Sequence, residues 1–403
     1  MRNSMKKHAF AAFFLLITSF LFADIYFSGF AGAKGDFYSS EEDNFDPALE
    51  IQSFFSGQFS LSKNLIMNTE FSLATDDLVK NSIFKESPAR FRIDELSLIA
   101  RQQLPSATNY LSFFVGTYEP IGSDTFLRRQ FGIQPIASKI TESWLGLSGS
   151  IIYPVFGVGG ADVIRLNKAP IATGFYFYVN HELEDCYVLN SDLRFAGNYR
   201  YFTFDIAGGL GLPLKSNSEQ DAFIIVDTIY WRAGTNILIG NAYTTSLFIQ
   251  AGVSEVKFKK EDEEFKINED TAYLLVEPRF RTKQSQIHLT LFSLPQETVD
   301  DFIFITDTSG VNLNIFSDTL HLSNKTFTFG FNSAFTFPNK NLSDLVSEPE
   351  KILDDYTITI APYITTNFYN GEVHFMLQGR ISDLLDEHYG SAFKVNLGYK
   401  TQF

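Results

Sequence analysis

Long stretches of this chain alternate between apolar and polar residues. In the segment 393–403 the odd positions carry apolar residues or Thr, and the even positions carry polar residues or Gly. The same alternation, with few exceptions, occurs in 49–61, 187–195, 327–337 and 373–381. Because successive side chains of a β-strand point to opposite faces, each segment is predicted to be a strand with one apolar and one polar face.

The predicted strands are longer than those of most soluble sheets. They run to about ten to thirteen residues, whereas soluble strands usually have about five or six and tilted membrane-spanning strands about nine to eleven. Their second face carries Ser, Thr, Asn, Gln, Gly and scattered charges, which suits a wet lumen. Strand length therefore favours a transmembrane barrel over a soluble sandwich, whose polar face would meet bulk water.

The alternation and the turn signals together predict eighteen strands, an even number as expected for a single-chain bacterial barrel. Long and short connections alternate between them. The stretches 154–170 and 302–325 are ambiguous, and sixteen strands is the alternative. The predicted strands are 25–36, 48–61, 64–76, 89–103, 108–118, 141–153, 171–180, 184–197, 199–212, 222–239, 243–254, 271–282, 285–293, 302–316, 326–337, 355–367, 371–381 and 391–403.

The N-terminal residues have the layout of a secretory signal peptide. A short basic region precedes the apolar segment 9–22, and Ala23 ends the predicted cleavage site. This pattern predicts a signal peptide at 1–23 and one barrel domain at 24–403. No Cys directly follows the apolar segment, which argues against a lipid-anchored lipoprotein.

The final strand resembles the closing strand of bacterial outer-membrane β-barrels. Those proteins end on an aromatic residue that is part of the signal read by the barrel-assembly machinery, and this chain ends on Phe403. A second aromatic is usual three residues from the end, where this chain has Thr401, and the nearest aromatic is Tyr399. The resemblance implies an all-β, transmembrane, antiparallel up-and-down barrel of about 16–18 strands, integral to the outer membrane and in contact with its lipid.

A barrel of this width cannot fill its interior with side chains alone, so it leaves an aqueous channel unless it is plugged. The chain is therefore expected to be porin-like, a channel for passive diffusion of small polar solutes. Two alternatives stay open: an outer-membrane transporter of hydrophobic substrates of the fatty-acid type, and a non-transport barrel that acts as an adhesin or structural protein. The resemblance to porins also leaves a homotrimer open.

The composition is acidic, with 32 Lys and Arg against 47 Asp and Glu and a formal net charge of −15. This charge argues against nucleic acid as a partner. It also suggests a cation preference, although acids of the external loops add to the charge without setting selectivity. Cys186 is the single cysteine, which excludes an intramolecular disulfide and a cysteine metal site.

No motif predicts a catalytic, metal or cofactor site. His181 begins like a zinc-protease motif, but the second His is missing. The run 157–160 lacks the spacing of a dinucleotide-binding loop and is expected to be a turn or bulge. The acidic cluster 261–264 lacks the alternating ligands and central Gly of a calcium loop. His388 has no nucleophile motif beside it, so an enzyme is not expected.

One predicted loop carries candidate functional residues. In general porins the third external loop folds into the barrel and narrows the pore, and 119–140 is the third external loop of this chain on the predicted count. Opposed charges across a constriction sort solutes by charge and dipole. The alternative is a loop that lies over the mouth with its charges solvated. The candidate constriction residues are Glu119 and Asp124 against Arg128, Arg129 and Lys139.

Overall fold

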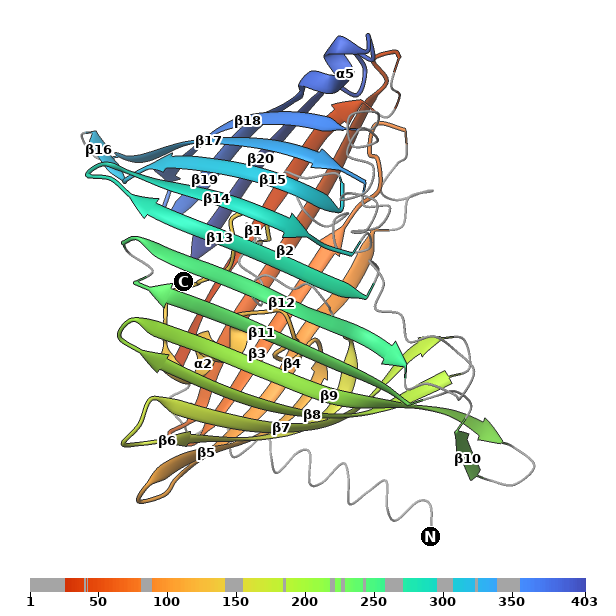
Figure 1. Ribbon diagram of the computed structural model, residues 1–403, viewed down its shortest axis with the longest axis vertical. Coiled ribbons are helices and arrows are strands. Elements are labelled where there is room, and N and C mark those ends of the chain that lie inside the picture. The colour runs from red at the N-terminus through yellow and green to blue at the C-terminus, as the bar shows by residue number, and fades with distance from the viewer. Residues whose placement is uncertain are drawn as a thin grey trace, which may run out of the picture.

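The chain forms one closed antiparallel sheet in a computed structural model (Figure 1). The structure describes residues 26–39, 41, 43–80, 89–141, 155–183, 186–217, 222–225, 229–241, 244–257, 271–295, 307–322, 325–338 and 356–403. The predicted signal peptide lies outside these residues, as does the acidic cluster 261–264. Within the described residues, no helix has the length and apolar character needed to cross a bilayer.

The sheet consists of long strands joined in chain order, with two short helices in the part of the connections that the structure describes. The helices are α2 (Thr125–Phe131) and α5 (Ile381–Leu385). The strands are β1 (Tyr26–Ser39), β2 (Pro47–Ser62), β3 (Leu65–Ala74), β4 (Arg90–Gln103), β5 (Ala107–Gly116), β6 (Gly157–Leu166), β7 (Ile171–Leu183), β8 (Cys186–Tyr199), β9 (Phe202–Asn217), β10 (Ala222–Ile225), β11 (Tyr230–Gly240), β12 (Ser246–Lys257), β13 (Ala272–Arg281), β14 (Ser285–Ser293), β15 (Ser309–Ser317), β16 (Leu320–Leu322), β17 (Lys325–Phe337), β18 (Thr357–Phe368), β19 (Gly371–Arg380) and β20 (Phe393–Gln402).

The described strands form an eighteen-strand barrel. Each strand pairs with its neighbours in the chain, and β20 pairs with β1 to close the ring. The short strands β10 and β16 add no position to the ring, because β10 and β11 both pair with β9, and β15 and β16 both pair with β17. This topology confirms the predicted up-and-down barrel and decides between the counts of eighteen and sixteen.

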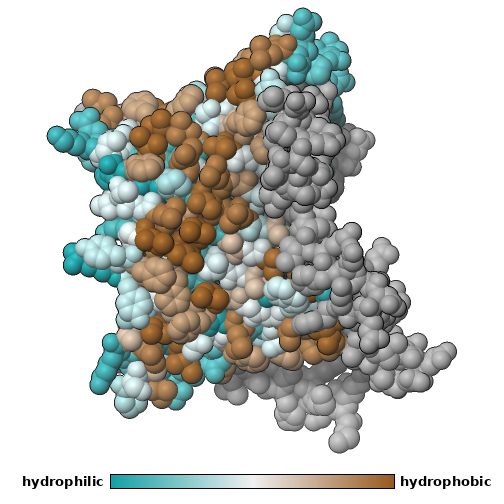
Figure 2. Space-filling model, in the orientation of Figure 1, coloured by the Kyte–Doolittle hydropathy of each residue, from teal (hydrophilic) through white to brown (hydrophobic). Residues whose placement is uncertain are grey.

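The two faces of the wall differ in chemistry as the alternation predicted. Polar side chains such as Asn190, Asp205 and Thr290 are buried on the inner face. Apolar side chains such as Leu111 and Leu193 point outward and are 61% and 64% exposed. Figure 2 shows brown apolar residues in a band across the wall, with teal polar residues at the ends of the strands. An outward apolar band of this kind is typical of a wall that faces lipid hydrocarbon.

The position of one strand differs from the prediction. The strand between β5 and β7 is Gly157–Leu166, whereas the sequence pattern placed it at 141–153, which lies almost entirely outside the described residues. The run 157–160 is therefore part of a strand, and the expectation of a turn or bulge was wrong. A Cβ atom at Gly159 would lie 2.3 Å from the carbonyl oxygen of Phe177, so glycine lets β6 approach β7 closely.

The seam of the barrel lies between the two ends of the described chain. The pairing of β1 with β20 runs from Phe30 opposite Gln402 to Tyr38 opposite Lys394. Beyond it, Gly29 and Phe403 exchange two backbone hydrogen bonds of 2.9 and 3.0 Å. The predicted pairing of the final strand with the first is confirmed, and closure leaves no sheet edge unpaired in lipid.

Candidate functional site

The connection between β5 and β6 turns back into the barrel, and the structure describes it as far as Thr141. We call residues 117–141 the inner segment. It contains α2, which lies inside the ring of strands in Figure 1. The helix ends at Gly132, whose φ of 63° is left-handed, a conformation that glycine adopts without steric cost.

Side chains of the inner wall hold the first half of the inner segment through its backbone carbonyls. Arg194 on β8 donates to the carbonyl oxygens of Glu119 and Ser123, at 2.6 and 3.1 Å. Asn236 on β11 donates to the Ser123 carbonyl at 2.9 Å, and Gln250 on β12 donates to the Gly122 carbonyl at 2.7 Å. Buried carbonyl groups need such partners, so these donors fix the depth of the segment.

A second group of wall residues holds the end of the segment. Arg279 on β13 donates to the carbonyl oxygen of Ile136 at 2.8 Å. The buried Glu277 carboxylate accepts hydrogen bonds from Ser138 of the segment, from Thr290 on β14 and from Arg279. Every member of this network has a partner, which is the condition under which buried charges rigidify a structure.

Apolar packing adds to these polar contacts. Phe126 and Leu127 of α2 have no exposed surface, and Ile136 and Ile140 are nearly as buried. They belong to one cluster with Phe248 and other wall residues. Full burial of a Leu or Phe side chain contributes roughly 1.5–3 kcal/mol, so the inner segment is a packed part of the fold.

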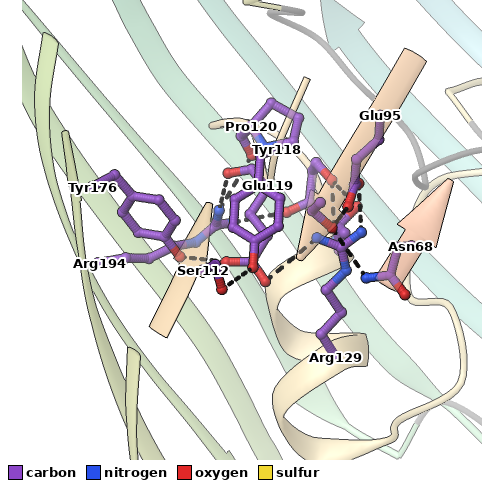
Figure 3. A network of polar contacts seen from close by, with 12 residues as sticks. Asn68, Glu95, Ser112, Tyr118, Glu119, Pro120, Arg129, Tyr176 and Arg194 are labelled. Carbon is purple, nitrogen blue, oxygen red and sulfur yellow. Dashed lines mark hydrogen bonds and ion pairs between the residues drawn. The ribbon is translucent and has the colours of Figure 1, made fainter. Parts of the chain in front are cut away.

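A charged network joins α2 to β4 and, through Glu119, to β7 (Figure 3). The Arg129 guanidinium lies between two carboxylates, bonded to Glu95 on β4 and 3.7 Å from Glu119. The Tyr176 hydroxyl on β7 donates to Glu119 from the other side, and Arg129 stacks over the ring of Tyr118 at 4.9 Å. Burial raises the pKa of the Glu119 carboxyl, and the positive charge of Arg129 only partly offsets this effect.

The structure brings some of the predicted constriction residues together. Glu119 is paired with Arg129, and Asp124 lies 3.9 Å from Arg128 on the next turn. Asp124 is buried and accepts hydrogen bonds from the backbone N–H groups of Ile136 and Ala137. Its carboxylate therefore ties the two halves of the segment together and does not line the barrel interior.

The three basic residues of the candidate set are more exposed than the two acids. Arg128 and Arg129 keep 29% and 20% of their side chains exposed. Lys139 is also partly exposed, with its Nζ 5.4 Å from the ring centre of Phe316 on β15. The acids of the inner segment are thus enclosed, while its bases remain accessible.

Sequence reasoning did not single out the wall residues that hold the inner segment. Arg194, Asn236, Gln250 and Glu277 come from four different strands. Each occupies an inward position in the middle of its strand, where the alternation places a polar residue. That signal marks them as inward-facing, but it does not identify the segment they contact.

Other sequence candidates do not form a site within the described residues. No group of three or more His, Cys, Asp or Glu side chains there could hold a metal ion. His288 is buried against Glu277, 3.1 Å from its carboxylate. His388 is half-exposed and lies 3.8 Å from Asp43 in the first connection.

Comparison with known proteins gives matches in structure alone. Neither a scan against protein-family models nor a search of curated proteins finds a match. Solved structures do match. OccK5 (OpdH) of Pseudomonas aeruginosa aligns at a TM-score of 0.51 and 7% identity, over 94% of this chain and 98% of that one.

Two further structures align over similar lengths. A mutant of the Rh. blastica porin gives a TM-score of 0.43 at 7% identity, over 94% of this chain and 100% of that one. A loop L8 deletion mutant of OmpT from Vibrio cholerae gives 0.38 at 8% identity, over 94% and 99%. With the closed eighteen-strand ring and its outward apolar band, the likeness to OccK5 identifies the fold of this chain as that of a porin-like channel, an integral β-barrel of the outer membrane.

Proposed function

We propose that this protein is a channel for passive diffusion of small polar solutes through a water-filled barrel. The observation that carries the proposal is the position of the inner segment. Its hydrogen bonds described above run along one side of the barrel, to strands from β4 to β13. A segment held against one side narrows an eighteen-strand lumen, whereas a plug would have to fill it.

The opposite side of the wall supports a wet lumen. The inward positions of β18 to β20 and β1 carry polar side chains, among them Thr365, Lys394, Asn396 and Asp36. Lys394 keeps 34% of its side chain exposed. Asn396 and Asp36 are buried, but a polar wall with a partly accessible Lys394 suits the passage of hydrated solutes better than the binding of a hydrophobic substrate.

We also infer that the inner segment is the constriction of this channel, with different roles for its charged residues. Glu119 and Asp124 hold the segment in place, and Arg128, Arg129 and Lys139 line the opening. The burial of the two acids and the accessibility of the three bases support this assignment.

Single-channel recording of the purified full-length protein in planar lipid bilayers tests the proposal. A stable conductance proportional to voltage is expected, and liposomes that contain the protein should swell in small sugars and amino acids. The matched control is the same preparation after heat unfolding, which should give no steps. A folded barrel, shown by heat-modifiable migration, that conducts no ions and admits no solutes would refute a channel.

A further inference from the structure

We propose that the constriction selects small anions, although the chain as a whole is acidic. This inference rests on the proposed channel function and adds the class of solute. The formal net charge of −15 suggests the opposite selectivity. The charge that a permeating ion meets is set by the side chains accessible at the narrow point, because charges beyond about 8–10 Å are largely screened at physiological salt.

The acids around the inner segment are enclosed by donors. Asp205 on β9 receives two hydrogen bonds from the Arg194 guanidinium, and Glu277 on β13 receives one from Arg279 at 2.8 Å. Glu95 is fully buried between Arg129 and Ser97. A carboxylate that is buried and paired in this way presents little field to a passing ion, because its partner cancels it at close range.

Some basic groups at the same level have spare hydrogen-bonding capacity. Arg128 keeps 29% of its side chain exposed, and among the described residues the 3.9 Å contact with Asp124 is the one ion pair of its guanidinium. Arg101 on β4 is half-buried, and its enclosed Nε–H finds no acceptor among the described residues. Guanidinium groups with free N–H donors are suited to bind carboxylate and phosphate oxygens.

These bases form a continuous group. Arg101 lies directly across from Tyr110 on β5, and the guanidinium of Arg165 on β6 stacks over the same ring at 5.7 Å. Arg165 also donates to the carbonyl oxygen of Gln130 at 2.6 Å. Gln130 follows Arg129 directly in α2. The wall arginines therefore extend the basic surface of α2 across β4 and β6, the two strands that flank β5, and a cluster of cations focuses anions into a narrow opening.

The charged residues on the far wall do not offset the basic residues of the constriction. Lys34 lies 3.3 Å from Asp36, and Lys400 lies 3.1 Å from Glu372. Lys394 is 4.0 Å from Asp36, which Lys34 already pairs. These inward charged residues therefore each have an oppositely charged neighbour, and Lys394 shares Asp36 with Lys34.

The reversal potential in a KCl gradient across a planar bilayer tests this inference on the full-length protein. The wild-type potential should have the sign of chloride preference. Arg128→Gln and Arg101→Gln should each shift it toward potassium, because each removes an accessible cation from the opening. Lys80→Gln is the matched control. It changes the net charge equally but lies in the β3–β4 connection, paired with Asp46, so the potential should not move.

The outcomes separate this inference from the channel itself. Conductance with a potassium-preferring wild type would overturn anion selection and leave the channel standing. Anion selection by the constriction would also be overturned if both arginine variants keep the wild-type potential while heat-modifiable migration shows that they are folded. Absence of any conductance would refute the proposed function. An equal shift in Lys80→Gln would show that the net charge of the protein, and not the constriction, sets the selectivity.

Discussion

The ring of Phe403 stacks on the ring of Phe27, with centroids 5.1 Å apart and planes inclined by 21°. Phe403 also lies 6.0 Å from Phe55 on the next strand. The row of rings continues outward along the wall through Phe71 to Phe91. The C-terminal residue therefore has a role in the finished barrel, because it covers the outer side of the seam where β20 meets β1.

Replacement of Phe403 by Ala should weaken the closed barrel. Stacked aromatic pairs contribute about 0.5–1.5 kcal/mol beyond the area they bury, and Phe403 makes two such contacts. We expect the free energy of unfolding in lipid vesicles, measured by urea titration, to fall by roughly 1–3 kcal/mol. The control is Phe113→Ala, since Phe113 also faces outward but has no ring contact within the described residues. An equal loss in both variants would argue against a special role of the seam.

The same residue is proposed to be part of the signal for the barrel-assembly machinery, together with Tyr399. Deletion of Phe403 should lower the amount of protein assembled in the outer membrane while secretion across the inner membrane continues. Cell fractionation with heat-modifiable migration measures both quantities. Normal assembly of the truncated chain would leave Phe403 with its packing role alone.

Much of the barrel could be predicted from the sequence because alternation is a local signal. The strand expected at 326–337 is β17, Lys325–Phe337, with one face of Phe residues. The signal failed at β6, where glycines occupy inward positions 157 and 159 and remove the contrast between the faces. Those glycines fit against Tyr178 on β7, and a contact with a strand 20 residues away leaves no mark in the local pattern.

The candidate site was predictable in its location but not in its chemistry. The position of 119–140 in the order of loops indicated that it enters the barrel. The pairing of Glu119 with Arg129 depends on Glu95 and Tyr176, which approach from β4 and β7. Which charges become buried is decided by those long-range contacts, so the sequence could not separate the enclosed acids from the accessible bases.

Arg194→Met should release the first half of the inner segment. The substitution removes the donors to the Glu119 and Ser123 carbonyls and leaves the Asp205 carboxylate buried without its ion partner. Removing one member of a buried ion pair costs about 3–5 kcal/mol. We expect a loss of that order in the free energy of unfolding and a larger, noisier single-channel current.

The double variant Arg194→Met/Asp205→Leu separates these two effects. Removing both charges should recover much of the stability, because no unpaired charge remains in the wall. The carbonyl donors are still absent, so the current noise should persist. If the noise disappears together with the instability, Arg194 does not position the segment.

Glu119→Gln should change how stability depends on pH. Burial raises the pKa of this carboxyl in the folded protein, so between the unfolded and folded pKa values the folded state binds more protons. The free energy of unfolding should therefore fall as pH rises through that window, and the penalty is complete above the folded pKa. In Glu119→Gln the fall should be smaller, while the exposed Glu41→Gln should match wild type. Urea titrations in vesicles from acidic to neutral pH test this, and an unchanged slope in Glu119→Gln would contradict it.

One charged residue interrupts the outward apolar band. Asp162 on β6 lies directly between Leu111 on β5 and Phe175 on β7, whose side chains point outward. Apart from residues near strand ends, it is the one Asp, Glu, Lys or Arg with an outward side chain among the described strands. It makes no hydrogen bond or ion pair with other described residues. An unpaired carboxylate in this position opposes insertion of the wall into hydrocarbon.

Asp162→Leu should therefore stabilise the isolated barrel in lipid. Charged residues on the lipid face of a barrel cost about 2–4 kcal/mol for Arg or Lys and less for Asp, so a gain of roughly 1–2 kcal/mol in the free energy of unfolding is expected. Asp386→Leu is the control, because Asp386 is exposed in the connection after α5 and should give no gain. The comparison is made by urea titration in vesicles and again in short-chain detergent, where the gain should shrink as the apolar layer becomes thinner and wetter. A loss of stability in Asp162→Leu that Asp386→Leu does not share would show that the carboxylate has a favourable partner and does not face lipid.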